Sequence, residues 1–308
     1  MAHKKKLSII IPVYNEKRSL SQLYQELLEQ INQYDYEVIF VDDGSKDGSI
    51  EVIYDLKEKN DRIKVFMLRR NIGKSMALNI GFQKAIGDII ITMDADLQDD
   101  PKEIPNFIEK INEGYDIVNG WKIDRKDPLE KRFPSKLFNK MVSLMSGIKL
   151  HDFNCGFKAY RKEVVKTIKV YGEMHRFIPV LAYEYGFIST EIPVKHHKRV
   201  HGESKFGFER YFRGFFDFLS LYFLIRYSRK PLHFIGTTSM INLILAVLLI
   251  GYTGIMKFYY GQTGVRPALF VGLFFLSAAL QIFMTGFVAE LLIHNFQKNV
   301  DDQLYLKN

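Results

Sequence analysis

Two long stretches without a charged residue lie in the C-terminal third of the chain. The first covers residues 234–256 and the second covers residues 268–289. Each is long enough to cross the roughly 30 Å hydrocarbon core of a membrane as a helix. The alternative, a buried core helix of a soluble protein, is disfavoured by the length of both stretches. We therefore expect two transmembrane helices within residues 231–293, joined by a short hairpin at residues 257–267.

Basic residues are distributed unevenly around these two stretches. Three of them immediately precede the first stretch: Arg226, Arg229 and Lys230. The hairpin carries only Lys257 and Arg266. Because short loops rich in Lys and Arg stay on the cytoplasmic side, we expect the large N-terminal part and the tail at residues 294–308 to lie in the cytoplasm.

The N-terminal part alternates short apolar runs with segments of helical periodicity. The runs predict strands, and apolar residues spaced three or four apart predict helices between them. The expected strands are residues 7–13, 36–41, 65–68 and 88–93, and the expected helices are residues 19–31, 48–56 (capped by Asp47) and 71–86. This alternation is typical of a Rossmann-like α/β fold, with a mainly parallel sheet flanked by helices.

The strand expected at residues 88–93 leads directly into acidic residues. Asp94 and Asp96 follow it, separated by one residue. Residues two apart at the end of a strand point the same way, so both carboxylates can converge on one divalent cation. A polar turn is the alternative, because Asp is common in turns. Tyr14 and Asp43 follow two other expected strands, and ligands of such sheets bind at the carboxyl ends of the strands, so we expect all three sites to face one crevice.

Cysteine content and glycine motifs exclude several other kinds of site. The chain has one cysteine, Cys155, which excludes an internal disulfide and a cysteine-based metal site. Neither the dinucleotide-binding motif G-x-G-x-x-G nor the P-loop motif G-x-x-x-x-G-K-[ST] occurs. Residues 73–75 (GKS) end like a P-loop, but Leu68 stands where its first glycine would be.

Two segments combine charged residues with many apolar ones. Residues 128–145 have a basic amphipathic pattern, which fits a helix in a membrane interface or an ordinary packed surface helix. Residues 206–230 are rich in Phe and Tyr and predict interfacial helices that dock on the bilayer.

The net charge of the chain is +8. We expect phosphates or an anionic bilayer to be the partners of this basic excess, and no nucleic acid.

Several short motifs occur in a characteristic order. They include residues 11–16 (IPVYNE), 41–45 (VDDGS) and 94–96 (DAD). Residues 120–135 (GWK…R.DP..KR.PS) and 151–161 (HDFNCGFKAYR) add further motifs. The chain resembles the inverting glycosyltransferases of family 2, and within them the polyprenyl-phosphate glycosyltransferases. This group includes dolichyl-phosphate mannose synthases, bactoprenol glucosyltransferases and undecaprenyl-phosphate aminoarabinose transferases.

The resemblance implies a domain organisation. Residues 1–205 would form a cytoplasmic catalytic domain of GT-A fold, and residues 206–230 would form juxtamembrane interfacial helices. Residues 231–293 would contain the two transmembrane helices, and residues 294–308 would be a cytoplasmic tail. The protein would then be a multi-pass protein of the inner cell membrane.

The resemblance also implies a reaction. A single sugar would pass from a nucleotide sugar to undecaprenyl phosphate or another polyprenyl phosphate, with inversion, on the cytoplasmic face of the membrane. The enzyme would be a metal-dependent hexosyltransferase that uses Mg²⁺ or Mn²⁺. Glucose from UDP-glucose is the first expectation, because the two-span pattern resembles bactoprenol glucosyltransferases. GDP-mannose, a UDP-N-acetylhexosamine and UDP-formyl-aminoarabinose are the alternative donors.

The resemblance assigns donor-side residues by position. Five residues would contact the nucleoside: Pro12, Tyr14, Glu16, Asp43 and Ala95. Asp94 would face the ribose and the metal, while Asp96 and Gln98 would coordinate the cation together with the diphosphate. The cation would stabilise the negative charge of the departing diphosphate. Arg199 and Lys205 would add further positive charge there.

On the acceptor side, Lys122, Arg132 and Ser135 would hold the lipid phosphate. Several relatives carry Arg at the position of Lys122, and a lysine keeps the charge but lacks the bidentate fork. By analogy with phosphorylated side chains, the acceptor phosphate is largely ionised at neutral pH, so a strong general base is not required. Asp152 would act as a base or orient the acceptor, and a capping or turn role is its alternative.

Two other classes of function are less consistent with the motifs. Processive polysaccharide synthases typically carry a Q-x-x-R-W motif, but Trp121 is the only tryptophan and no such motif precedes it. A non-catalytic membrane module that binds nucleotides would not need Asp94, Asp96, Arg132 and Arg199 together. The resemblance further implies a homo-oligomer, because relatives include tetramers, and a flippase as a further partner.

Overall fold

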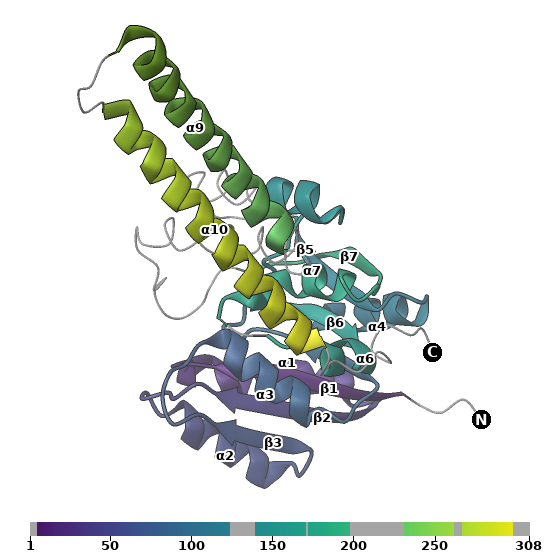
Figure 1. The fold of residues 1–308 in the computed structure, drawn as a ribbon. Coiled ribbons are helices and arrows are strands. Elements are labelled where there is room, and N and C mark those ends of the chain that lie inside the picture. Colours follow the sequence, from purple (N-terminus) through teal and green to yellow (C-terminus); the bar gives the residue numbers. More distant parts are fainter. Residues whose placement is uncertain (1–4, 124–138, 171, 198–230, 262–266, 298–308) are drawn as a thin grey trace. The chain divides into compact units, whose positions relative to one another are not determined.

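The computed structural model describes residues 5–123, 139–170, 172–197, 231–261 and 267–297 (Figure 1). The chain forms two compact units, Met1–Phe218 and Leu219–Asn308. The domain boundaries that the sequence predicts after residues 205 and 230 lie outside the described residues, as do the interfacial helices expected at residues 206–230.

The first unit is built on one seven-stranded sheet with the strand order β3-β2-β1-β4-β6-β5-β7. Its strands are β1 (Lys6–Val13), β2 (Asp35–Asp42), β3 (Ile63–Met67), β4 (Ile89–Thr92), β5 (Ile117–Lys122), β6 (Lys158–Arg161) and β7 (Ser189–Val194). The pairs β1–β2, β1–β4, β2–β3 and β5–β7 are parallel. The mainly parallel sheet that the sequence predicts is therefore confirmed.

Strand β6 runs against both of its neighbours, β4 and β5. Because of this reversal, β6 begins at the edge of the sheet where β4 and β5 end. The segment that leads into β6, residues 152–157, therefore reaches the same edge as the acidic residues that follow β4. Three segments far apart in the sequence meet there.

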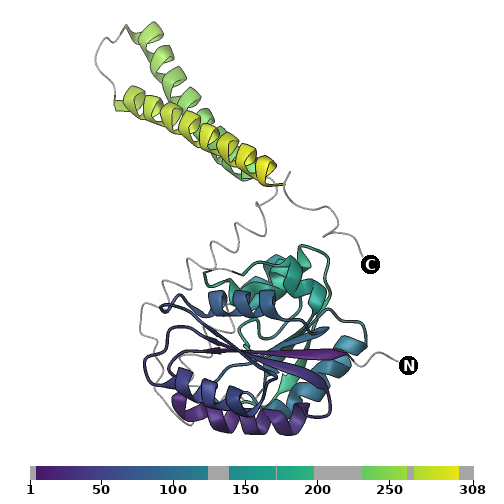
Figure 2. The same cartoon turned by 90° about the horizontal axis from the view of Figure 1, so that it is seen from below.

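Helices cover both faces of the sheet (Figure 2). The helices of this unit are α1 (Lys17–Ile31), α2 (Ser49–Lys59), α3 (Lys74–Lys84), α4 (Ile104–Asn112), α6 (Lys162–Thr167) and α7 (Ile178–Tyr183), with short 3-10 turns η1 (Pro101–Glu103) and η2 (Met174–Phe177). Residues 139–146 are also helical. Each helix expected from periodicity over the first ninety residues is present.

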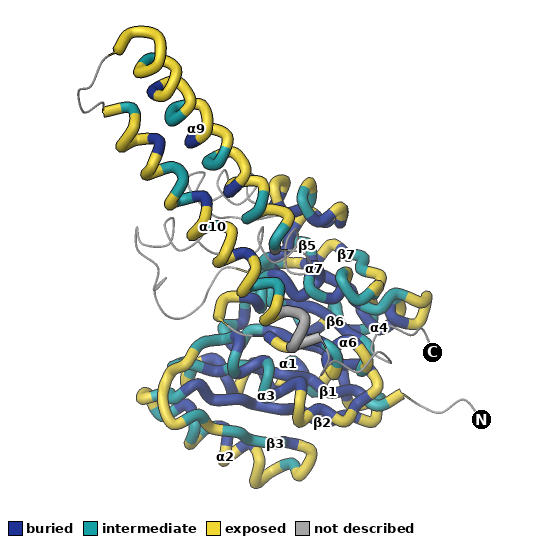
Figure 3. Tube along the Cα trace, in the orientation of Figure 1, coloured by how far each residue is buried: buried dark blue, intermediate teal, exposed yellow. Residues whose placement is uncertain are grey.

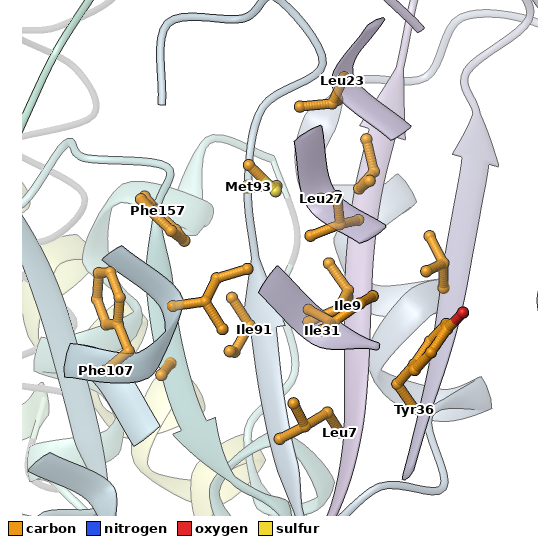
Figure 4. Packing of buried hydrophobic residues seen from close by; sticks show 14 of the residues in the cluster. Leu7, Ile9, Leu23, Leu27, Ile31, Tyr36, Ile91, Met93, Phe107 and Phe157 are labelled. Atoms are coloured by element: carbon orange, nitrogen blue, oxygen red, sulfur yellow. The ribbon is translucent and has the colours of Figure 1, made fainter. Parts of the chain in front are cut away.

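The main core lies between the sheet and helices α1, α2 and α4. Leu27 and Ile31 of α1 point at Ile9 and Ile91 of the central strands (Figure 4). These side chains are fully buried, and the sheet is the most deeply buried part of the unit (Figure 3). Such burial on both faces explains why the central strands read as nearly continuous apolar runs.

Two helix ends differ in detail from the sequence expectation. Helix α3 begins at Lys74 rather than at residue 71, because Gly73 adopts φ +116° and breaks the helical path before it. Helix α2 has Gly48, not Asp47, at its N-cap. Asp47 still provides a hydrogen-bond acceptor at the start of this helix, because its carboxylate accepts the backbone N–H of Ser49 at 3.0 Å.

The second unit is a pair of long apolar helices, α9 (Pro231–Tyr260) and α10 (Pro267–Gln297). Within them, Leu232–Tyr260 and Pro267–Leu292 are long and apolar enough to cross a membrane. Helix α9 continues through Tyr260, so the connection between the helices is shorter than the hairpin expected at residues 257–267. Most of their large apolar side chains are exposed (Figure 3), as a lipid-facing surface would require.

Small residues hold these two helices together. A Cβ on Gly272 would lie 2.8 Å from Ile250, and one on Gly286 would lie 2.8 Å from Ile235. The hydroxyl of Ser239 donates to the carbonyl of Ala279 at 2.8 Å. Close backbone approach at small residues and hydrogen bonds between helices are typical of membrane-embedded pairs.

Replacing Gly81 by Ala tests the packing of α3 on the sheet. A Cβ at this position would overlap Cγ2 of Ile10 and lie 3.2 Å from its Cδ1, and Ile10 is fully buried in β1. Overpacking costs about 1–3 kcal/mol, which outweighs the gain in helix propensity of about 1 kcal/mol. We expect Gly81→Ala to lower the midpoint of thermal unfolding, whereas Gln83→Ala on the exposed side of the same helix should leave it unchanged. A Gly81→Ala protein as stable as the parent would contradict this packing.

Candidate active site

The carboxyl ends of β2, β1 and β4 lie side by side, because these strands are adjacent and parallel. The loops that follow them carry Tyr14, Asp43 and Asp94, which the sequence places in one crevice. The structure puts all three at this edge of the sheet. The residues that the sequence predicts for the donor side therefore lie on neighbouring loops at this edge.

Hydrogen bonds join the loop after β1 to the loop after β2. The N–H of Asn15 donates to the hydroxyl of Ser45 at 2.9 Å, and the N–H of Lys46 donates to Oδ1 of Asn15 at 2.8 Å. The N–H of Glu16 donates to the hydroxyl of Ser49 at 2.9 Å. Asn15 adopts φ +55°, which only a few residue types tolerate. The backbone beside Pro12, Tyr14 and Glu16 is thus held in a defined shape.

Asp43 is buried and organises a third loop. Its two carboxylate oxygens accept the N–H groups of Ile72 and Gly73, at 2.8 and 2.9 Å. This loop leads directly into α3 and sets the position of Lys74. The contact of Asp43 with a nucleoside, which the family resemblance implies, stays a prediction.

Asp94 forms an ion pair with Lys74. Burial alone would raise the pKa of Asp94, but the positive charges of Lys74 and Lys122 outweigh it and lower the pKa to about 2. The carboxylate also lies against Gly156, where a Cβ would approach its oxygens to 2.7 Å. Asp94 is therefore ionised at neutral pH and is enclosed by α3 on one side and by the segment before β6 on the other.

Lys74 is a site residue that the sequence analysis missed. The motif Gly73-Lys74-Ser75 resembles only an incomplete P-loop, so the sequence gives Lys74 no other role. The available signal was its position at the first turn of a helix that follows a strand end, since such positions lie at the ligand-binding edge of α/β sheets.

The loop from Asp96 to Asp99 has an unusual backbone. Leu97 adopts φ +61°, a conformation that is costly for a residue with a branched side chain. Its side chain is buried in the core, which holds the loop in place. The neighbouring carboxylate of Asp96 accepts the N–H of Gln98 at 3.2 Å. Backbone strain of this kind tends to occur at functional sites, so the loop is a good candidate for ligand contact.

The predicted cation ligands Asp94, Asp96 and Gln98 lie on this one loop. In the described part of the chain, no three His, Cys, Asp or Glu side chains are grouped closely enough to form a metal site by themselves. The oxygen donors that are present fit a hard cation such as Mg²⁺ or Mn²⁺, which commonly takes one or two carboxylates and completes its shell with substrate phosphates and water. The residues are therefore consistent with a cation that binds together with a diphosphate.

Lys122 lies in a buried cluster of charges. Its side chain is 13% exposed, and its Nζ lies 3.4 Å from Oδ1 of the fully buried Asp99. Burial would lower the pKa of Lys122, but the charge of Asp99 and of other nearby groups raises it above its ordinary value. Sequence reasoning assigned Lys122 to an acceptor phosphate and missed Asp99. The structure shows that the charge of Lys122 is already partly balanced inside the protein.

Asp152 and Lys158 lie at the start of the reversed strand. Asp152 is buried, and its carboxylate accepts the N–H of Asn154 at 3.0 Å. The ammonium of Lys158 is also buried and donates to the carbonyl oxygens of Phe153 and Cys155. Burial lowers the pKa of Lys158 and raises that of Cys155 to about 12. Cys155 is thus a packed thiol with no nucleophilic character at neutral pH.

Several predicted residues lie outside the described part of the chain: Arg132, Ser135, Arg199 and Lys205. Of the amphipathic segment at residues 128–145, only the end is described. There, Val142 is buried while Leu144 is 86% exposed and Met141 is 39% exposed. An apolar face that remains exposed in this way favours a membrane-interface helix over a packed surface helix.

Comparison with known families identifies the family of this chain. The model of glycosyl transferase family 2 matches residues 8–169, which include the loops after β1, β2 and β4 and the segment before β6. This chain belongs to the family 2 glycosyltransferases. The carboxylates and lysines at the sheet edge are therefore the active-site candidates of a family 2 glycosyltransferase.

Relatives in this family are similar over most of the chain. A dodecaprenyl-phosphate galacturonate synthase from Rhizobium johnstonii is 36% identical over 95% of this chain and 89% of its own length. An undecaprenyl-phosphate 4-deoxy-4-formamido-L-arabinose transferase from Shewanella sediminis is 41% identical over 70% of this chain and 66% of its own length.

Solved structures agree on the fold. A glucosyl-3-phosphoglycerate synthase from Mycobacterium tuberculosis, crystallised with Mn²⁺, UDP-glucose and phosphoglyceric acid, superposes with a TM-score of 0.53. The match covers 71% of this chain and 79% of that one, at 15% sequence identity. The GT-A type of α/β sheet, followed here by two long apolar helices, is thus confirmed.

Replacing Lys122 by Met tests the buried charge cluster of the glycosyltransferase. Removing one partner of a buried ion pair leaves the other charge uncompensated and costs about 3–5 kcal/mol. We expect Lys122→Met to destabilise the protein by about this amount, and Lys122→Met with Asp99→Asn to recover most of the loss. Urea unfolding of the full-length protein in detergent, followed by Trp121 fluorescence, gives the measurement.

A matched control is Lys110→Met, which removes an exposed lysine that pairs with Glu113 at 2.8 Å. Exposed pairs contribute little, so this variant should unfold like the parent. If Lys122→Met were equally harmless, Asp99 would not depend on Lys122.

Proposed function

We propose that this glycosyltransferase transfers a single sugar from a nucleotide sugar to a polyprenyl phosphate, most simply undecaprenyl phosphate, with inversion at the anomeric carbon. The observation that carries the proposal is the similarity over 95% of the chain to a polyprenyl-phosphate glycosyltransferase. The arrangement of Asp94, Asp96 and the lysines at one sheet edge supports it, because this chemistry must balance the charge of a departing diphosphate.

The relatives favour a donor other than glucose. Their names give 4-deoxy-4-formamido-L-arabinose and galacturonate as the transferred sugars. The formamido sugar was among the alternatives that the sequence left open, whereas galacturonate was not. We therefore propose a UDP-linked formamido-pentose or uronic acid as the donor, in place of UDP-glucose.

The residues at the sheet edge suit the steps of such a transfer. A divalent cation held by Asp96 and Gln98 would act as a Lewis acid toward the diphosphate. Lys74 and Lys122 supply positive charge beside Asp94. An acceptor phosphate is anionic at neutral pH and attacks the anomeric carbon without prior proton removal. Positioning of donor and acceptor would then provide most of the rate enhancement.

The decisive assay supplies the full-length protein with undecaprenyl phosphate and a panel of donors. The panel contains UDP-4-formamido-arabinose, UDP-galacturonate, UDP-glucose, a UDP-N-acetylhexosamine and GDP-mannose, each with Mg²⁺, Mn²⁺ or EDTA. We expect lipid-linked product from one of the first two donors, and none with EDTA. Transfer from UDP-glucose alone would reverse the choice of sugar, and no product from any donor would reject the proposed function.

Asp96→Asn tests the cation site. The variant keeps an oxygen that can accept the N–H of Gln98 but loses the negative charge, so the fold should persist. If the variant no longer holds the cation, the transition state loses several kcal/mol of stabilisation, and kcat should fall about 10³-fold. Asp61→Asn, the same change in an exposed turn, is the control and should retain full activity. Near-normal turnover of Asp96→Asn would show that this carboxylate does not hold the cation.

We also propose that the two long helices span the membrane and that the catalytic unit lies in the cytoplasm. The lengths of Leu232–Tyr260 and Pro267–Leu292 support the spans. The basic residues that precede the first span support the orientation. The exposed apolar side chains of Met141 and Leu144, next to Lys140, would suit contact with an anionic bilayer.

A cysteine at Tyr260 tests this orientation. Tyr260 is 68% exposed at the end of α9, and the native Cys155 is buried, so background labelling should be low. We expect Tyr260→Cys in intact spheroplasts to react with a membrane-impermeant maleimide. Lys59→Cys, at the exposed end of α2, should react only after the membrane is permeabilised. The reverse labelling pattern would place the catalytic unit outside the cell.

A further inference from the structure

His175 and Ser75 form a pair beside the candidate active site that the mechanism above does not use. Ser75 is buried in the first turn of α3, and His175 lies in η2. The hydroxyl of Ser75 lies 2.9 Å from Nδ1 of His175 and accepts the backbone N–H of His175 at 3.1 Å. The histidine ring is thus fixed by a neighbour of Lys74.

The hydrogen-bond pattern assigns the tautomer of this ring. Ser75 has a single hydroxyl hydrogen, and its only hydrogen-bond partners in the described part of the chain belong to His175. A buried hydroxyl hydrogen without an acceptor is costly, so it points at Nδ1. Nδ1 is then the acceptor, and the ring hydrogen of a neutral histidine is on Nε2.

Burial and nearby positive charges keep the ring neutral. Burial lowers the pKa of His175 well below its ordinary value. The positive charges of Lys74 on α3, Arg176 on η2 and Lys158 on β6 lower it further, and Asp94 opposes them. At neutral pH, His175 therefore carries no charge and presents Nε2–H as a hydrogen-bond donor.

His175 lies near Asp94. It is hydrogen-bonded to Ser75, the neighbour of Lys74, and Lys74 pairs with Asp94. Among the residues that the structure describes, none accepts a hydrogen bond from Nε2, and the His175 residue is partly exposed. A neutral donor that is held by Ser75 and has no partner among the described residues therefore lies near Asp94, which follows β4.

We propose that Nε2–H of His175 donates a hydrogen bond to an oxygen of the transferred sugar and so helps to select the donor. This inference rests on the proposed glycosyl transfer. In such a transfer the nearby lysines would balance the charge of phosphate groups, and a neutral donor would add little to that balance. It provides direction instead, which is what recognition of a sugar oxygen needs, because a site built to bond a polar group discriminates against ligands that lack it.

The test measures the effect of His175 on use of the UDP-sugar separately from its effect on binding of UDP. His175→Leu removes the donor, whereas His175→Gln keeps an N–H near the position of Nε2. For each full-length variant in nanodiscs we would measure kcat/KM for the UDP-sugar that the parent enzyme uses and the dissociation constant of UDP. Thermal unfolding of each variant reports whether the fold is retained.

We expect His175→Leu to lower kcat/KM for the UDP-sugar by roughly 10-fold to 100-fold, the effect of losing one hydrogen bond to a buried polar group. UDP should bind within about twofold of the parent value, because it lacks the sugar that His175 would contact. His175→Gln should recover most of the activity. Equal losses for UDP and UDP-sugar, or a folded His175→Gln as defective as His175→Leu, would overturn the proposal.

Ser75→Ala gives a second measurement that does not depend on the leucine variant folding. Without the hydroxyl, Nδ1 loses its donor and both tautomers become populated, so kcat/KM for the UDP-sugar should fall by a few-fold while UDP binding is unchanged. Unchanged kcat/KM in a folded Ser75→Ala protein would contradict the tautomer assignment on which the proposal depends. If the parent enzyme transfers no sugar, the proposed function fails first, and binding of the UDP-sugars by calorimetry still tests the role of His175.

Discussion

The balance of charge at the carboxyl edge of the sheet is the constraint on which the site depends. Asp94, Asp99 and Asp152 come together there in partly or fully buried positions, and carboxylates so placed repel one another and lose solvation. Lys74 and Lys122 offset this repulsion and loss of solvation, since each pairs with one of the carboxylates. Their presence lets the edge stay ionised and ordered before any substrate phosphate or cation arrives.

The reversal of β6 is what brings these charges together. In an all-parallel sheet, the segment before β6 would enter at the opposite edge, far from the residues that follow β4. Because β6 is antiparallel to β4 and β5, residues 152–157 pack against Asp94, and Gly156 permits the close approach. Lys158 then fixes this segment by donating to the carbonyl oxygens of Phe153 and Cys155. A topological feature thus determines the shape of the site.

The sequence predicted the first half of the sheet well and the second half poorly. Strands β1, β2 and β4 are buried on both faces and read as apolar runs, so hydrophobic patterning finds them. Strand β6 has four residues with the sequence KAYR, and its buried Lys158 gives no apolar signal. Asp94 and Asp96 were recognised because they directly follow a strand. Lys74, Asp99 and His175 were not, because their roles arise from tertiary contacts with partners such as Lys122 and Ser75, which no local pattern contains.

The residues at this edge would have two different tasks, and the charge of each residue suits it to one of them. Groups that balance the charge of phosphates must themselves be charged, and the structure keeps Lys122 ionised despite its burial. Recognition of a sugar among similar sugars also depends on the direction of hydrogen bonds, because hydroxyl, formyl and carboxylate oxygens of different sugars occupy different positions. A neutral ring such as His175, which is held by Ser75 and whose pKa is lowered by burial and by nearby cations, meets this second requirement. Burial and the charge of Lys74, which also pairs with Asp94, therefore keep the neighbouring histidine an uncharged donor.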